Sequence, residues 1–394
     1  MLRIPIETGI AAGAPAWIEV DLEAVAHNVR EFVRVRVLGP GCRVIAVVKA
    51  NAYGHGMARV ARAALVAGAS GLAVANVAEG EELRGFGIEA PILVIGAMAP
   101  EEASAAILHE LVPSLGSREL AHAVHSAARR PVPVHIEIDT GMRRHGVPVE
   151  EVTDFVAALQ VQRRLHLAGV FTHFAAVHER ELAGMQQQLV AFSAALARLR
   201  DLGTPLRHAA NTLGALLVPE ARLDAVRIGG GLYGFDPLRG QGPVQLRPAL
   251  SLKARLVGLR DAAVSDEVGY GGTFVCCRPS RLGLVPLGYA DGLVRSAWHD
   301  ASVLVRGRRA PIVGVASMNQ TVVDVTEVPD VTLGDEVVLL GAQGDEVVRV
   351  EERVPPGGTC YEVTSLLRAN LPRRYLPARG GGAVGHGHVD RGLR

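Results

Sequence analysis

Eight short apolar segments recur between residues 44 and 228 of this 394-residue chain, and most of the stretches between them are rich in Ala, Leu and Glu with helical period. The candidate strands begin near Val44, Leu72, Ile92, Leu111, Val134, Leu167, Arg207 and Ala225. Because strands that alternate with helices form parallel sheets, eight such pairs predict a (β/α)8 barrel. The segments at 111–115 and 207–209 are weak strands, and a doubly wound open sheet would leave the same trace.

The pattern changes near residues 234–248, where glycine and proline accumulate. Segments rich in Val, Leu and Thr follow, separated by turn residues, at positions 282–287, 302–306, 321–325 and 336–340. Short strands between turns predict a separate, mainly β domain. We therefore expect an α/β chain with an N-terminal (β/α)8 barrel in residues 1–240 and a mainly β C-terminal domain in residues 241–377.

Residues 378–394 are rich in Gly and His and have almost no apolar periodicity, which predicts a disordered tail. His386 and His388 in this tail could bind a metal adventitiously, and we expect no functional metal site. The four cysteines have neither metal-finger spacing nor the density of a disulfide scaffold, so we expect free thiols.

The composition argues against two classes of partner. The net charge is +1, so the chain has no overall attraction for nucleic acid or for an anionic membrane. No apolar run approaches the length of a membrane span, and residues 1–5 lack the basic start of a signal peptide. We expect a cytoplasmic protein with no nucleic-acid or membrane partner.

One lysine stands where chemistry is expected in a barrel. The apolar run 44–48, with the letters VIAVV, indicates a strand buried on both faces, and Lys49 follows at its carboxyl end. Ligands bind at this rim in α/β folds. An amine held against an apolar strand is poorly solvated, so its pKa can fall and it can attack a carbonyl as a Schiff-base lysine does. The alternative is a lysine that marks the exit of the strand into solvent.

Two later segments could bind an anion. Asn211 and Thr212 follow a short strand, and the glycines 229–231 follow the last barrel strand. Glycines let backbone N–H groups approach a phosphate, and loops after late barrel strands are a recurrent phosphate site. A glycine triplet alone is more often a flexible turn.

The letters VKANAYGHG at residues 48–56 resemble the cofactor-lysine motif of bacterial alanine racemases, which depend on pyridoxal 5′-phosphate (PLP). The resemblance recurs along nearly the whole chain. It implies that the first strand, at about residues 10–20, joins the second domain. It also implies a homodimer in which the second domain of one subunit faces the barrel of the other, so that the active sites are shared.

The resemblance implies a set of cofactor-binding residues: Lys49, Tyr53, His173, Asn211, Thr212, Arg227, Gly229, Gly230 and Tyr361. In the family, the tyrosines contact the cofactor phosphate and the arginine bonds the pyridine nitrogen. Because arginine keeps its proton, it donates a hydrogen bond without protonating the ring. The ring is then a weaker electron sink, which suits a racemase because it disfavours transamination.

The resemblance also implies the residues that act on the substrate. Racemisation needs a base on each face of the reacting carbon, and Lys49 and Tyr270 match the two catalytic bases. Arg144 and Met318 match the residues that hold the substrate carboxylate. Tyr289 matches a residue at the active-site entrance.

Gly230 stands where the family usually has a larger apolar residue, but it still offers its N–H, and two further positions depart from the family pattern. Glu137 stands where many racemases have a carbamylated lysine, and Asn319 stands where they have aspartate. We hypothesise that the glutamate replaces the carbamate and orients Arg144 by a charge-assisted hydrogen bond. The loss of a charge at Asn319 leaves the reaction class unchanged and bears on substrate range and turnover.

The resemblance therefore predicts a PLP-dependent racemase that interconverts L- and D-alanine for peptidoglycan precursors. One alternative is a serine or broad-specificity racemase on the same scaffold. A more distant alternative is a decarboxylase of the same barrel type that uses Cys360 as a proton donor. A non-catalytic PLP carrier would resemble the barrel only, whereas this chain also has the second domain with Tyr270.

Overall fold

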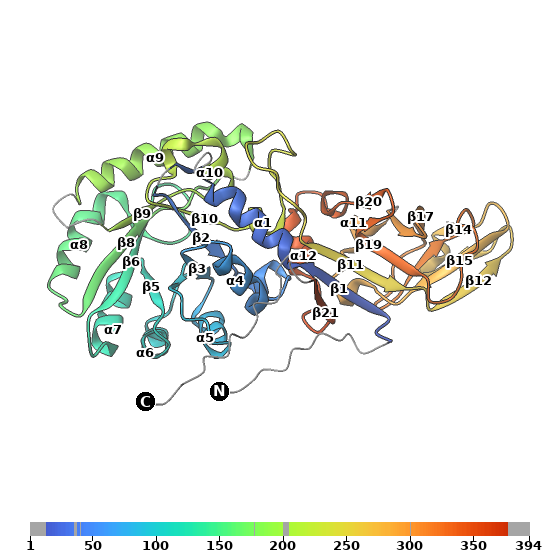
Figure 1. Ribbon diagram of the computed structural model, residues 1–394, viewed down its shortest axis with the longest axis horizontal. Helices are drawn as coiled ribbons and strands as arrows, with labels where there is room; N and C mark the ends of the chain where they lie inside the picture. The colour runs from blue at the N-terminus through green and yellow to red at the C-terminus, as the bar shows by residue number, and fades with distance from the viewer. Residues whose placement is uncertain are drawn as a thin grey trace, which may run out of the picture.

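The computed structural model describes residues 13–34, 38–39, 41–176, 178–199, 205–299 and 301–376. Over these residues the chain forms two bodies that lie end to end along the longest axis (Figure 1). The predicted tail 378–394, with His386 and His388, lies outside the described residues.

The first body is a closed barrel of eight parallel strands. They are β2 (Arg43–Val47), β3 (Gly71–Val74), β4 (Ile92–Val94), β5 (Val112–Leu115), β6 (Val132–Asp139), β8 (Leu165–Phe171), β9 (Leu206–His208) and β10 (Ala225–Ile228). The β5–β6 pairing and the β10–β2 pairing close the ring. This closure confirms the barrel, including the two weak strands, and excludes the open sheet. A short strand, β7 (Val147–Pro148), pairs with β6 outside the ring.

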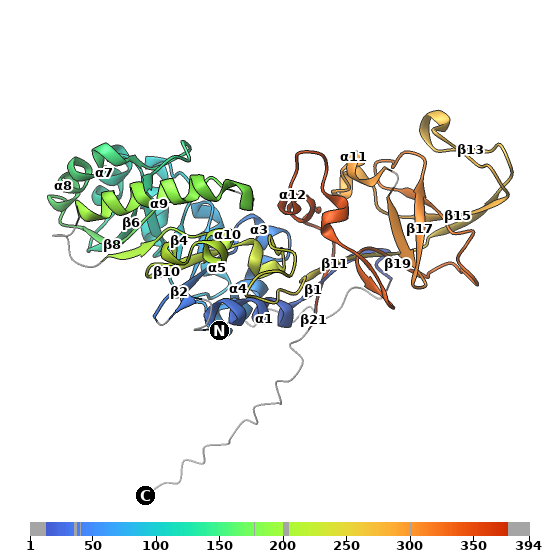
Figure 2. The same cartoon turned by 90° about the horizontal axis from the view of Figure 1, so that it is seen from above.

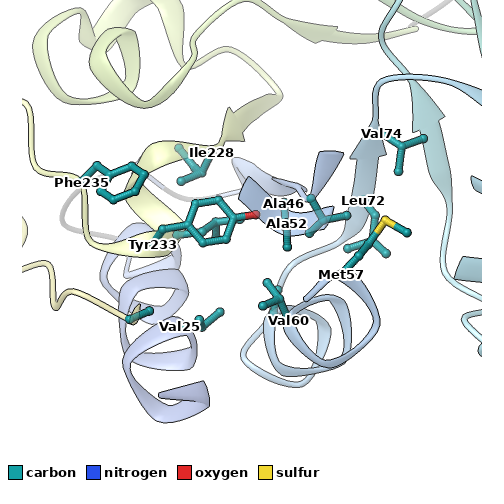
Figure 3. Packing of buried hydrophobic residues seen from close by; sticks show 14 of the residues in the cluster. Val25, Ala46, Ala52, Met57, Val60, Leu72, Val74, Ile228, Tyr233 and Phe235 are labelled. Atoms are coloured by element: carbon teal, nitrogen blue, oxygen red, sulfur yellow. The ribbon is translucent and has the colours of Figure 1, made fainter. Parts of the chain in front are cut away.

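Helices cover the outside of the barrel (Figures 1 and 2). They are α1 (Leu22–Val33), α4 (Met57–Val66), α5 (Val77–Gly85), α6 (Ala103–Leu108), α7 (Arg118–Ala127), α8 (Val152–Gln160), α9 (Leu182–Ala197) and α10 (Thr212–Leu217). Several begin at a side-chain cap, as at Asp21, which accepts hydrogen bonds from two backbone N–H groups of α1. Figure 3 shows Val25 of α1 and Val60 of α4 packed toward Ala46 and Leu72 on the strands. This contact buries one apolar stripe of each helix.

The second body is mainly β, as predicted. Its large sheet has the order β12 (Gly258–Ala262), β15 (Ser280–Val285), β18 (Thr321–Asp324), β17 (Arg308–Val313), β16 (Ser302–Val305), β19 (Glu336–Gln343), β11 (Leu250–Arg255), β1 (Ala16–Asp21) and β21 (Arg373–Leu376), and β20 (Glu346–Val348) pairs with β19. A separate hairpin joins β13 (Glu267–Val268) and β14 (Phe274–Val275). The helices are α11 (Arg295–Trp298) and α12 (Cys360–Ser365).

The first strand of the chain belongs to the second sheet, because β1 pairs antiparallel with β11 and parallel with β21. The two bodies also touch through two glycines. A Cβ on Gly54 would lie 2.0 Å from the carbonyl oxygen of Thr364, and one on Gly56 would lie 1.8 Å from Oη of Tyr375. Glycine at both positions therefore lets the loop after Lys49 lie directly against the second domain.

Candidate active site

Lys49 opens an unusual turn at the carboxyl end of β2. The four residues after it, 50–53, all have φ between 52° and 54°, in the left-handed region that residues with a side chain seldom occupy. Glu79 stabilises this turn, because its Oε1 accepts a hydrogen bond from the N–H of Ala50 at 2.7 Å. Its Oε2 accepts one from Ala75 after β3, also at 2.7 Å. One carboxylate thus joins the ends of two neighbouring strands beside the lysine.

The amine of Lys49 lies in the environment that the sequence predicts. Burial lowers its pKa, the positive charge of Arg144 lowers it further, and the carboxylate of Glu79 opposes both. A lysine with a lowered pKa is deprotonated more often near neutral pH and is then a nucleophile or a base.

Arg227 lies inside the barrel at the same rim and is almost completely buried. Its two terminal nitrogens donate to the carbonyls of Thr172, His208 and Ala209 and approach Nδ1 of His208 at 2.7 Å. Burial lowers its pKa to about 10, so the guanidinium stays charged at neutral pH. Its Nε has no hydrogen-bond acceptor among the described residues. This geometry leaves one donor for a ligand.

His173 and His208 are neutral neighbours of this arginine. Burial is the main cause that lowers the pKa of each well below its usual value, and the charge of Arg227 adds to it. The other ring nitrogen of His208 contacts a second buried histidine, because Nε2 of His208 lies 2.9 Å from Nδ1 of His135. The backbone of His173 is held by Gln188, whose side-chain amide donates to its carbonyl at 3.0 Å.

The glycine segment after β10 is held by Thr212. The Oγ1 of this residue accepts hydrogen bonds from the N–H groups of Gly229 at 3.3 Å and Gly231 at 3.2 Å. Asn211 does not face these glycines through its side chain; it caps α10 by accepting from the N–H of Gly214 at 2.9 Å. The threonine therefore shapes the loop, and the asparagine begins the helix next to it.

The hydroxyls of Tyr53 and Tyr361 both lie close to this glycine segment. A Cβ on Gly229 would lie 2.7 Å from Oη of Tyr53, and one on Gly230 would lie 2.8 Å from Oη of Tyr361. Neither hydroxyl has a hydrogen-bond partner among the described residues. Burial raises the pKa of both phenols, so both keep their protons and can donate. Two free donors beside a glycine loop can hold an anion, and we call Tyr53, Tyr361 and the glycines 229–231 the anion cradle.

Our prediction of a hydrogen bond between Arg144 and Glu137 is wrong. Glu137 is buried, and its Oε2 accepts a hydrogen bond from Nδ1 of His145 at 2.8 Å. The side chain of Arg144 is exposed and forms no ion pair with the described residues. Its charge still acts on the site, because it lowers the pKa of Lys49, His173 and Arg227.

Tyr361 of the second domain reaches its own barrel, whereas Tyr270 does not. Tyr270 and Met318 are 75% and 55% exposed. Tyr270 lies between β13 and β14, which Figures 1 and 2 place at the end of the second domain away from the barrel. Tyr289 is also exposed, and the side chain of Asn319 donates to Oδ2 of the buried Asp291 at 3.4 Å.

The structure also brings residues to the site that the sequence did not indicate: Glu79, His208, Tyr233 and His145. Tyr233 is buried against Tyr53, with ring centroids 4.8 Å apart, and donates its hydroxyl to the carbonyl of Val47 at 2.9 Å. The position of Glu79 in the first turn of a helix after the neighbouring strand was a usable signal. The four cysteines are free, as predicted. None of the described helices is long and apolar enough to cross a membrane.

This combination of a barrel with a poorly solvated lysine, a buried arginine and an anion cradle, followed by a β domain that exposes a tyrosine, defines an amino-acid racemase. Residues 20–237 match the alanine racemase N-terminal domain, and residues 249–375 match the alanine racemase C-terminal domain. The chain belongs to the alanine racemase family.

The chain is similar over nearly its whole length to named alanine racemases and to solved structures of alanine racemases. The alanine racemase of Syntrophobacter fumaroxidans is 41% identical over 364 residues, which are 91% of this chain and 96% of that protein. The solved structure of alanine racemase from Bacillus anthracis with bound L-Ala-P has a TM-score of 0.86 and 33% identity, and the match covers 93% of this chain and 96% of the other. The biosynthetic alanine racemase from Pseudomonas aeruginosa has a TM-score of 0.82 and 36% identity, with 93% and 100% covered.

Proposed function

We propose that the protein interconverts L- and D-alanine with PLP as cofactor, and that it supplies D-alanine for peptidoglycan precursors in the cytoplasm. The observation that carries this proposal is the poorly solvated amine of Lys49 beside an open anion cradle at the barrel rim. The similarity to alanine racemases over both domains supports alanine as the substrate.

The residues of the rim fit the cofactor. The free hydroxyls of Tyr53 and Tyr361 and the glycine loop would hold its phosphate, and a larger residue at Gly230 would fill that space. The free Nε of Arg227 would donate to the ring nitrogen without giving up its proton. When bound, PLP supplies an electron-withdrawing ring that makes the Cα proton of the attached amino acid acidic.

The protein's own residues then move the proton. Lys49 would accept or return it on one face of Cα, and Tyr270 would do so on the opposite face. Arg144 and the backbone N–H of Met318 would hold the substrate carboxylate and fix the orientation of Cα. Because Tyr270 lies far from Lys49 in one chain, we infer a head-to-tail homodimer in which the partner supplies the tyrosine.

The chain offers a sharp test of the lysine, because Lys49 and Lys253 are its only lysines. Lys253 is paired with Glu19 at 3.0 Å in the second domain, which makes it a matched control. We expect sodium borohydride to attach PLP permanently to Lys49 and not to Lys253, as read by peptide mass spectrometry. Labelling of Lys253 alone, or of neither lysine, would overturn the proposal.

Turnover tests the reaction and its substrate. The Lys49→Ala protein should lose racemisation by at least about 10³-fold, whereas Lys253→Arg should keep it. Loss of optical activity, measured in parallel with alanine, serine and larger amino acids, decides the specificity. Serine is included because Glu137 and Asn319 depart from the family pattern. Faster turnover of serine than of alanine would contradict the alanine assignment.

A further inference from the structure

A buried carboxylate near the rim is left without a role in the proposed reaction. Glu137, on β6, is 2% exposed, and its Oε2 is bonded to Nδ1 of His145 at 2.8 Å. The side chain of His145 is 18% exposed, so the pair is largely removed from water. A buried carboxylate is unfavourable unless it is hydrogen-bonded, so this contact makes the position of Glu137 possible.

Two glycines make room for this pair. A Cβ on Gly116, directly after β5, would lie 2.6 Å from Nε2 of His145. One on Gly146 would lie 3.1 Å from Cγ of Glu137. The imidazole and the carboxylate thus lie against bare backbone, and a side chain at either glycine would crowd them.

The pair lies at the end of the loop that carries Arg144. The loop begins at Asp139, whose Oδ1 accepts hydrogen bonds from the N–H groups of Gly141 at 2.9 Å and Arg143 at 3.1 Å. It ends at His145, which is fixed by Glu137. Arg144 lies between these anchors, and its own side chain has no hydrogen bond or ion pair to the described residues. The position of its backbone is therefore set by the loop.

The carboxylate also balances positive charge. Glu137 is the nearby negative group that raises the pKa of Arg227, whereas Arg144 lowers it. The charges of Arg144 and Arg227 both act on His173. Glu137 thus offsets the crowding of two guanidinium groups and an amine at one rim.

We propose that His145 is a positioning residue for substrate binding: by donating Nδ1–H to Glu137, it anchors the loop that presents Arg144 and holds the carboxylate beside Arg227. This inference rests on the proposed function, in which Arg144 binds the substrate carboxylate.

The test compares substitutions that remove or keep the donor. His145→Leu removes it, and we expect the KM for alanine to rise about 10- to 100-fold with a smaller change in kcat, since a misplaced binding group weakens binding first. His145→Asn places an amide nitrogen close to the position of Nδ1 and should restore most of the KM. The matched control is His109→Leu, which removes a histidine paired with Glu81 at 3.5 Å between α5 and α6 and should leave KM unchanged.

A second substitution keeps the test decisive if His145→Leu does not fold. The double variant Glu137→Gln/His145→Leu has no unpaired carboxylate, so it should fold, yet it still lacks the bond and should keep the raised KM. An unchanged KM in the single or the double variant, or equal changes in the Leu and Asn variants, would overturn the proposal.

A measurement on the ligand-free protein separates this proposal from the proposed function. Long-range 1H–15N spectra should show Nδ1 of His145 protonated in the wild type, and Glu137→Gln should shift that signal. A histidine protonated on Nε2 alone would disprove the anchor whether or not the protein racemises alanine. If the wild type shows no racemisation but the bond is present, the proposed function fails and the anchor stands.

Discussion

The two halves of the proposed site differ in how they are held. In the barrel, Lys49 and Arg227 lie in buried or half-buried positions and are fixed by neighbouring hydrogen bonds. In the second domain, Tyr270 and Met318 are largely exposed and stand on loops. The Tyr270 loop contains three glycines with positive φ, Gly269, Gly271 and Gly272. One half is thus organised within the chain, and the other presents its groups outward.

We infer from this contrast that the second domain contributes to the site through two different surfaces. Helix α12, which carries Tyr361, contacts the turn after Lys49 and completes the anion cradle of its own barrel. The Tyr270 loop lies at the end of the domain away from the barrel, and the Tyr289 loop lies beside the end of α12. Both expose large side chains, which is typical of a surface that meets a partner. We therefore expect each second domain to serve two barrels.

The strongest test of this comparison mixes two inactive proteins. Lys49→Ala and Tyr270→Phe each remove one base, and we expect Tyr270→Phe to lose about 10²- to 10⁴-fold in turnover. If the sites are shared, a mixed dimer has one site with both bases intact. Subunits that combine at random should then recover about a quarter of wild-type activity. Mixed dimers purified through two different affinity tags should show about half of wild-type racemisation, because one of their two sites is intact.

The control is a mixed dimer of Lys49→Ala with the double variant Lys49→Ala/Tyr270→Phe, which has no intact lysine and should stay inactive. If both bases act within one chain, the first mixture would also stay inactive. That result would contradict a site shared between two subunits.

The sequence predicted the barrel well because each strand is a local signal. All eight predicted strands are present, even β9, whose three residues have only weak strand character. The order of the ring then follows from the short right-handed connections of parallel strands. Lys49, Arg227 and the glycine loop come from the ends of these strands, so their gathering at one rim was predictable as well.

The sequence could not predict contacts that depend on a single side-chain direction. His145 and Arg144 are neighbours in the chain, and the sequence does not reveal that the space beside Gly116 admits the imidazole that reaches Glu137. The left-handed turn at residues 50–53 includes Ala50, Ala52 and Tyr53, whose ordinary preferences give no hint of positive φ. That turn depends on Glu79 and on the second domain, which are distant in sequence.

We expect acid to destabilise the barrel more than the second domain. Burial lowers the pKa of His55 and of His135 to about 4, so both stay neutral in the folded barrel below the usual value of 6.5. The unfolded chain binds those protons first, and stability therefore falls as the pH drops from about 6.5 toward 4. Each histidine should remove about 1.4 kcal/mol per pH unit in that window. Residues 249–375 contain one histidine, His299, so the second domain should be less sensitive.

Hydrogen exchange followed by mass spectrometry can measure both regions in one sample. Between pH 6.5 and 4.5, after correction for the intrinsic exchange rate, protection should fall more in β2 and β6 than in β16 and β19. The His55→Gln protein should lose less protection with acid than the wild type does. Equal losses in both regions would show that these histidines do not govern the acid response.

The smallest expected effect concerns the one place where the second domain completes its own barrel. A Cβ on Gly230 would lie 2.6 Å from a ring carbon of Tyr361, so Gly230→Ala requires that ring to shift within the cradle. We expect PLP to bind about 10-fold more weakly, because one charge-assisted donor to the phosphate is lost. The matched control is Gly184→Ala in α9, where a Cβ meets nothing within 4 Å and alanine favours the helix. Fluorescence titration gives both affinities.

If Tyr361 acts in the cradle, Tyr361→Phe should weaken PLP binding to a similar extent and should add little to the effect of Gly230→Ala. Full additivity of the two substitutions would show that the glycine and the tyrosine act separately.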